Sequence, residues 1–275
     1  MKNLQKNFFQ KSSLMRIKLF KKFYSLKEGH PGSVFSIIDI LIVLYYGGFV
    51  KFKKKGKKKI PFDDVIMSKG HATVGQYPIL HDLGVISDFN WKNWNNNKNK
   101  SSLRMFGNSH ISGIKASTGS LGHGIGFATG IGFSSLKKKK NKKIFVIISE
   151  GELYEGSTWE SFFLLSSLKL PNVYIILDIN NNIILGNPKK CLPLGNIKKK
   201  IESFNIKTFA CNGHNFKEIN LKLKKMKKIN GPTCLIAKTI KGKGLKMMEN
   251  KPQWHYWNDI SVSEYNKSIN ELKNK

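Results

Sequence analysis

The sequence has few acidic residues, with 17 Asp and Glu against 48 Lys and Arg, which gives a formal net charge of +31 over 275 residues. A charge of this size would suit nucleic acid or an anionic membrane surface as a partner. However, the lysines gather in loop-like runs at 53–59 and 137–143 rather than among exposed aromatic residues. The chain is also rich in Asn and Ile, so a bias of the coding DNA toward A and T explains the lysines better. We therefore expect no nucleic-acid site and no membrane site, and nucleic-acid binding is the weaker alternative.

Cysteine is scarce, and long hydrophobic runs are absent. The three cysteines, Cys191, Cys211 and Cys234, lack the spacing of metal ligands. An odd number of cysteines without a secretory signal favours a reducing compartment, and hence a cytoplasmic location. The most apolar segment, 34–46, is short and contains Asp39, so it is predicted to be a buried helix rather than a membrane span.

The stretch 144–182 is the most informative part of the chain. A short apolar run at 144–148 is followed by a helical pattern over 157–168 and by a second apolar run at 173–177. Strand, helix and strand in this order indicate a right-handed βαβ unit whose two strands are parallel and buried. The sequence therefore predicts an α/β fold with a mostly parallel sheet and helices on both faces.

Oxygen-bearing side chains follow both of these strands. Glu150 comes directly after the first, and Asp178 and Asn180 end the second. Ligands of such sheets bind beyond the carboxyl ends of the strands, and carboxylate and amide oxygens suit Mg²⁺ or Ca²⁺. Gly151 would let the backbone approach a phosphate closely, and the positive end of the following helix would face it. The alternative is a plain βαβ unit with polar residues at the strand ends by chance.

Several motifs resemble those of transketolases, which are thiamine diphosphate enzymes. Glu150-Gly151, with Asn180 thirty positions later, is similar to the thiamine diphosphate motif, and GELYEGSTWES at 151–161 resembles transketolase in particular. Further matching strings are GHPGS at 29–33, STGSLGHG at 117–124, KTIKGKG at 238–244 and MENKPQWH at 248–255. The resemblance covers about 29–256 and implies the fold of the diphosphate-binding domain.

The resemblance also implies a set of site residues. Three histidines would line the substrate channel as catalytic residues: His30, His110 and His255. Seven residues would bind the cofactor, thiamine diphosphate: His71, Gly119, Ser120, Leu121, Gly151, Glu155 and Asn180. A divalent metal, Mg²⁺ with Ca²⁺ or Mn²⁺ as alternatives, would be held by Glu150, Asn180 and the carbonyl of Asn182.

Two positions depart from the family's pattern. Glu150 stands where the family has Asp, and its extra methylene predicts weaker Mg²⁺ binding, because Mg²⁺ demands near-ideal octahedral geometry. His123 stands where the family has Gln, beside the expected cofactor. The alternative to an active enzyme is therefore a degenerate, non-catalytic subunit that binds a partner.

The resemblance extends only to the diphosphate-binding half of a transketolase. Residues 1–275 are expected to form a single domain, without the pyrimidine-binding and C-terminal domains. The implied protein is the N-terminal subunit of a split transketolase (EC 2.2.1.1), which transfers a two-carbon ketol unit between sugar phosphates in the pentose phosphate pathway. It would be active only with a complementary C-terminal subunit, in a homodimer or heterotetramer, and we expect pairing through faces near 119–133 and 152–163.

The remaining segments give plainer patterns. Helices are predicted at 1–28, 36–46, 125–136 and 216–228, and strands at 64–67, 208–211 and 233–237. Loops are predicted at 51–59, 88–101 and 186–195.

Overall fold

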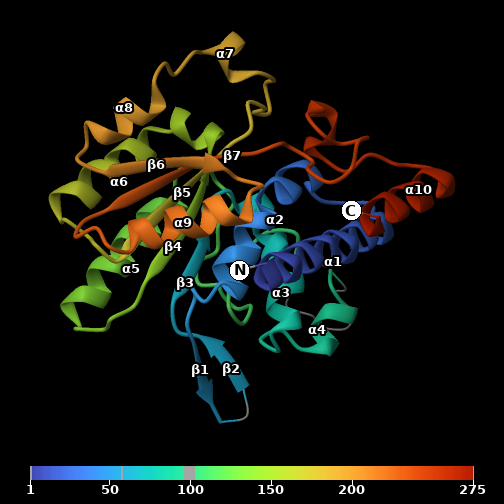
Figure 1. Ribbon diagram of the computed structural model, residues 1–275, viewed down its shortest axis with the longest axis horizontal. Helices are drawn as coiled ribbons and strands as arrows, with labels where there is room; N and C mark the ends of the chain where they lie inside the picture. Colours follow the sequence, from blue (N-terminus) through green and yellow to red (C-terminus); the bar gives the residue numbers. More distant parts are fainter. Residues whose placement is uncertain (1, 57, 96–102, 275) are drawn as a thin grey trace.

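The computed structural model describes residues 2–56, 58–95 and 103–274, and Figure 1 shows its architecture. At its centre is a five-stranded sheet in the order β3-β4-β5-β7-β6, in which every pairing is parallel. The predicted α/β fold is thereby confirmed. The strands are β3 (Asp64–Met67), β4 (Ile144–Ser149), β5 (Val173–Ile179), β6 (Lys207–Asn212) and β7 (Thr233–Lys238).

The two faces of the sheet are covered by separate hydrophobic cores. Side chains of a strand alternate between its faces, so Phe145 and Ile147 of β4 enter one core while Ile144, Val146 and Ile148 enter the other. A strand that is buried on both faces needs apolar residues at every position. This is why the central strands appear in the sequence as continuous apolar runs.

Helices form a layer on each side of the sheet (Figure 1). One face carries α1 (Lys2–Leu26), α2 (Pro31–Tyr46), α9 (Phe216–Met226) and α10 (Val262–Lys273), and the other carries α5 (Gly124–Lys137), α6 (Gly156–Ser167) and α8 (Ile197–Glu202). Nearly all of α2 is buried, as expected for a helix that is apolar all round. It begins five residues before the predicted start, because Pro31 at its first position needs no amide donor.

Two segments that were predicted to be loops contain secondary structure. Residues 51–59 contribute to an antiparallel hairpin of β1 (Phe52–Lys55) and β2 (Lys58–Pro61), which projects from the body in Figure 1. The lysine-rich strands pair because apolar residues alternate with the cations, and the Lys59 ammonium lies 4.6 Å from the Phe52 ring centroid. The loop prediction was therefore wrong here.

The second predicted loop, 88–101, begins with the short helix α4 (Asp88–Lys92). The Ser87 hydroxyl caps it by accepting a hydrogen bond from the Asn90 amide at 3.3 Å. Residues 96–101 lie outside the described residues.

The other predicted helices and strands are confirmed to within two residues over the described part of the chain. The elements that were not predicted are short: α3 (Tyr77–Asp82), α7 (Pro188–Cys191) inside the loop 186–195, and the 3₁₀ turns η1 (Gly70–Gln76), η2 (Glu150–Tyr154) and η3 (Pro252–His255). Among the described helices, none combines the length and the apolar character that crossing a membrane requires.

Candidate active site

A cavity of about 490 Å³ opens at the edge of the sheet where the parallel strands have their carboxyl ends. The segments that follow β3, β4, β5 and β7 all reach it, because parallel strands end at the same edge. They contribute Lys69 and His71, Glu150 and Gly151, Asn180 and Asn182, and Lys241. Residues far apart in the sequence thus share one cavity.

The structure brings together most of the residues that the sequence singled out. All of the predicted site residues except His110 and Ser120 line this cavity. Both of those are exposed on the surface. His123 is also exposed and does not line the cavity, so the second departure from the family's pattern lies away from the cavity wall.

Three of the predicted histidines form a cluster in the wall. The ring centroids of His30, His71 and His255 lie 5.2 to 5.6 Å apart. Burial, and then the charge of Lys241, lowers the pKa of His30 and of His255 to about 4. Burial, and then Lys69, lowers the pKa of His71 well below its usual value. The three imidazoles are therefore neutral at neutral pH, so each has one nitrogen that donates and one that accepts a hydrogen bond.

Asp178 does not serve as a strand-end oxygen for a ligand, contrary to the expectation from the sequence. It is fully buried, and its carboxylate forms an ion pair with the Lys69 ammonium at 2.7 Å. The hydroxyls of Ser36 and Thr239 also donate to it. Burial alone would raise the pKa of Asp178, but Lys69 and these hydrogen bonds lower it overall. The side chain turns inward because the alternation along β5 directs it into the α2 layer.

Lys241 is a cavity residue that sequence reasoning missed. It is 1% exposed, and its ammonium lies 3.2 Å from the carbonyl oxygen of Asn182 and 3.2 Å from Nδ1 of His255. Burial, and then the charge of Lys69, lowers the pKa of Lys241 to about 8. The string 238–244 contains three lysines, and nothing in it marks this one as buried.

Glu152 is a second residue that the prediction omitted. One of its oxygens accepts hydrogen bonds from the Ser68 hydroxyl and from the Gly122 amide at 3.1 Å, and the other accepts from the Ser149 amide at 2.7 Å. Burial raises its pKa. Glu152 thereby joins three loops of the site. The Ser-x-x-Glu spacing of a capping box at 149–152 is the sequence signal that could have revealed it.

The glycines of the site support a bound diphosphate. A Cβ added to Gly151 would come no closer than 3.8 Å to the protein, to Ile183, and one added to Gly119 would meet only Phe106 at 3.8 Å. At these positions the missing side chain leaves the backbone open to the cavity. By contrast, a Cβ on Gly70 would lie 2.3 Å from the Thr118 carbonyl oxygen, so that glycine serves packing.

A buried donor or acceptor also awaits a partner. Nδ1 of His30 is buried and has no hydrogen-bond partner among the described residues. Together with Lys241, the neutral histidines and the open glycine backbone, it fits an anionic ligand that carries hydroxyl or phosphate oxygens.

The predicted metal ligands converge, and each already meets a donor from the protein. Glu150 accepts from the Asn181 amide at 2.9 Å, Asn180 Oδ1 accepts from the Asn182 amide at 3.1 Å, and the Asn182 carbonyl accepts from Lys241. Burial raises the pKa of Glu150. Within the described residues, no three His, Cys, Asp or Glu side chains form a metal-binding group. One carboxylate with an amide and a carbonyl oxygen is the kind of incomplete set that suits a hard cation shared with phosphate.

Known proteins share both the sequence and the fold. The family model described as transketolase, thiamine diphosphate binding domain, matches residues 10–258. One chain of the apulose-4-phosphate transketolase of Actinobacillus succinogenes is 31% identical over 231 residues, which cover 83% of this chain and 82% of that protein. Human transketolase is 30% identical over 246 residues, which cover 88% of this chain and 38% of that protein.

Solved structures agree with these relatives. Transketolase from Campylobacter jejuni superposes with a TM-score of 0.82 at 25% identity, covering 97% of this chain and 46% of that one. The chain therefore spans less than half of the full-length transketolases and most of the apulose-4-phosphate transketolase chain. These findings show that the chain belongs to the transketolase family, in which it corresponds to the thiamine diphosphate-binding domain.

Proposed function

We propose that this chain is the cofactor-binding subunit of a two-chain transketolase that transfers a two-carbon ketol unit between sugar phosphates. The observation that carries the proposal is the convergence of Gly151, Asn180 and three neutral histidines in one cavity. EC 2.2.1.1 and the pentose phosphate pathway are the activity and pathway we propose. Two relatives are named for apulose 4-phosphate, so that sugar phosphate belongs among the substrates to be tested. The three free cysteines support a cytoplasmic location.

The residues of the cavity would divide the work of binding. Gly119 and Gly151 let the backbone approach the diphosphate, while Lys241 and His71 donate to its oxygens. Glu150, Asn180 and the Asn182 carbonyl would hold a divalent metal on the same group. Thiamine diphosphate, when bound, supplies the carbanion-stabilising chemistry.

The remaining histidines would handle protons and hydroxyl groups of the sugar. Because His30 and His255 are neutral near pH 7, each can accept a proton from a substrate hydroxyl and return it later. The Lys241 ammonium, 3.2 Å from Nδ1 of His255, favours the tautomer that keeps Nδ1 as an acceptor, which places the ring proton on Nε2.

We also propose that the complementary subunit covers the side of the molecule formed by α5 and α6. Large apolar side chains are exposed there, including Phe127 (48%) and Phe163 (67%), and the rim of the cavity is bordered by exposed Leu185 and Leu192. Patches of this kind mark interaction sites. Two relatives are named as single subunits of a transketolase, which supports a partner that supplies the rest of the enzyme.

Sedimentation of the two chains together tests the surface. Phe163→Ser should weaken the complex at least tenfold, because a large side chain is lost from its centre. Leu221→Ser removes a side chain of similar exposure (51%) from α9 on the opposite layer and should leave the complex unchanged. Equal behaviour of the two variants would place the partner elsewhere.

The function is tested by calorimetric titration of thiamine diphosphate in Mg²⁺, followed by an assay of ketol transfer with the complementary subunit. We expect cofactor binding by the mixed subunits and turnover only by the mixture. Absence of cofactor binding in both Mg²⁺ and Ca²⁺ would contradict the proposal.

One observation favours a second candidate, a non-catalytic subunit. The Lys241 ammonium occupies the Asn182 carbonyl, and the longer Glu150 replaces the family's Asp beside it. Cofactor binding without turnover, in a mixture that forms a stable complex, would identify this function.

A further inference from the structure

A turn outside the cavity holds the backbone that leads to Lys241. Residues 212–215 connect β6 to α9 and pack against 238–240, where the chain leaves β7. The Gly213 amide donates to the Lys238 carbonyl at 2.7 Å. A Cβ on Gly213 would lie 2.5 Å from Cγ2 of Thr239, so this contact requires glycine.

His214 in this turn makes the decisive hydrogen bond. The Thr239 amide still bonds to the neighbouring strand, at the Ile179 carbonyl, but the Ile240 amide lies beyond the sheet. Nε2 of His214 accepts from that amide at 2.8 Å. A buried amide without an acceptor is costly, and here a side chain supplies the acceptor that the sheet no longer provides.

The His214 ring is fixed from its other side. Nδ1 lies 2.7 Å from Oδ2 of Asp39. Since Nε2 accepts, the ring proton is on Nδ1 and is donated to this carboxylate. Arg16 contacts both oxygens of Asp39, at 2.8 and 3.0 Å. Burial alone would raise the pKa of Asp39, but Arg16 and His214 together hold it below its usual range.

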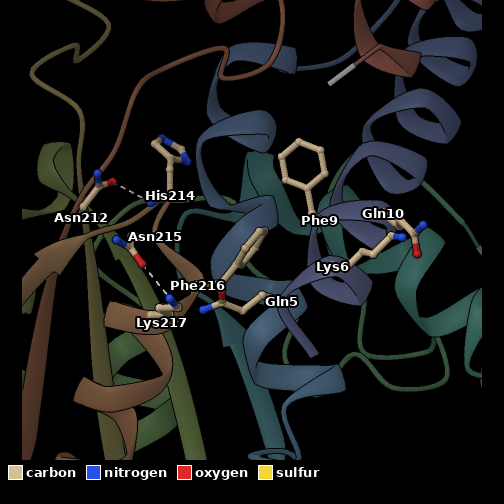
Figure 2. A pocket seen from close by; sticks show the side chains of 9 residues that line it. All are labelled: Gln5, Lys6, Phe9, Gln10, Asn212, His214, Asn215, Phe216 and Lys217. Carbon is tan, nitrogen blue, oxygen red and sulfur yellow. Dashed lines mark hydrogen bonds between the residues drawn. The ribbon is translucent and has the colours of Figure 1, made fainter. Parts of the chain in front are cut away.

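The surroundings of His214 differ from those of the cavity. Figure 2 shows it in the wall of an open hollow of about 900 Å³, with Phe216 on its own side and Phe9 of α1 across from it. The His214 amide donates to Asn212 Oδ1 at 2.9 Å, drawn as a dashed line. His214 does not line the cofactor cavity. Any effect on that cavity must therefore pass through the segment it holds.

We propose that His214 is a positioning residue of the cofactor site, which fixes the 239–241 segment so that the Lys241 ammonium reaches Asn182 and His255. The proposal rests on the proposed binding of thiamine diphosphate in the cavity. The path runs from Arg16 and Asp39, through His214 and the Ile240 amide, to Lys241.

Two substitutions separate positioning from general stability. His214→Asn keeps a donor at the place of Nδ1 for Asp39 but removes the acceptor for the Ile240 amide. His214→Gln keeps an acceptor at the place of Nε2 and removes the donor to Asp39. Both should lower the urea midpoint, whereas only His214→Asn should speed hydrogen exchange at Ile240 and acylation of Lys241, as measured by mass spectrometry.

Cofactor affinity gives the functional readout. In Mg²⁺, with the complementary subunit present, His214→Asn should weaken thiamine diphosphate binding about fivefold to tenfold, the effect of one hydrogen bond, and His214→Gln less than twofold. In the Lys241→Met background, His214→Asn should have no further effect, because the two residues act in series.

The outcomes discriminate. Additive effects of His214→Asn and Lys241→Met, or equal weakening by the Asn and Gln variants, would overturn the positioning role. If the parent chain fails to bind cofactor, the proposed function fails, while Lys241 acylation still decides the role of His214: an unchanged rate in His214→Asn would overturn it.

Discussion

Two buried aspartates at opposite ends of the sheet are used in different ways. Asp63, just before β3 at the amino end, is fully buried, and its oxygens accept from the backbone amides of Lys51 at 2.8 Å and Lys143 at 2.9 Å. Asp178, near the carboxyl end of β5, is equally buried but meets the Lys69 ammonium and two hydroxyls.

The difference separates a structural end of the sheet from a reactive one. At the amino end, a carboxylate joins two chain segments through neutral backbone donors, and its hydrogen bonds are complete. At the carboxyl end, Lys69 is neutralised by Asp178, but the second ammonium, Lys241, is met by two neutral acceptors, and Nδ1 of His30 has no partner among the described residues. Uncompensated positive charge beside open backbone favours an anionic ligand at that end only.

The largest effect is expected from removing the charged partner at the carboxyl end. Asp178→Ala leaves Lys69 buried without a counter-charge and should lower the free energy of unfolding by about 3–5 kcal/mol, measured by urea denaturation. In the double variant Lys69→Met/Asp178→Leu, part of this loss should return. A loss below about 1 kcal/mol in Asp178→Ala would mean that the pair is solvated.

The metal ligand should come next. Glu150→Ala should weaken thiamine diphosphate binding in Mg²⁺ by about 100-fold, since even residues behind a ligand cost 10- to 100-fold, or about 2.7 kcal/mol. Glu150→Asp should tighten binding in Mg²⁺, and Ca²⁺ should be less sensitive than Mg²⁺, because it tolerates irregular oxygen shells. The measurement is calorimetry with the complementary subunit.

Two results would correct the metal assignment. Parent-like binding by Glu150→Ala would place the metal elsewhere, and weaker binding by Glu150→Asp would show that the backbone has adapted to glutamate. Glu202→Ala on α8, outside the cavity, is the matched control and should bind the cofactor like the parent.

A smaller effect, on stability alone, is expected at the amino end. Asp63→Asn turns an amide donor toward one of two backbone amides and should lower the free energy of unfolding by about 2 kcal/mol. Cofactor affinity of the folded variant should not change. A clear loss of affinity would show that the two ends of the sheet are coupled and would weaken the comparison.

The pH dependence should be the smallest effect. The cavity histidines have folded pKa values below the usual 6.5, so the unfolded chain binds more protons below pH 6.5, and stability falls with pH from there to about 4. Replacing one of them, as in His255→Gln, should reduce the stability lost between pH 7.5 and 5.5 by about 1 kcal/mol. Urea midpoints at both pH values measure it. His110→Gln, at an exposed position outside the cavity, should leave the loss unchanged.

Local patterns account for what was predicted correctly. The apolar runs at 144–148 and 173–177 became central strands because burial on both faces demands such runs. The hairpin at 52–61 was missed since its lysines hide the alternation, and α2 was given a late start because the turn at 29–33 looked irregular. Both errors come from segments in which composition masks the backbone geometry.

Sequence alone determined the family, the parallel sheet and the motifs that border the cavity, because these depend on periodicity and on short strings of neighbouring residues. Tertiary structure alone decided which polar groups are paired. Lys69 and Asp178 are 109 positions apart, and Lys241 reaches Asn182 across 59. Nothing local marks such partners, because the energy of a buried charge depends on distance and exposure, which exist only after the strands have brought their ends together.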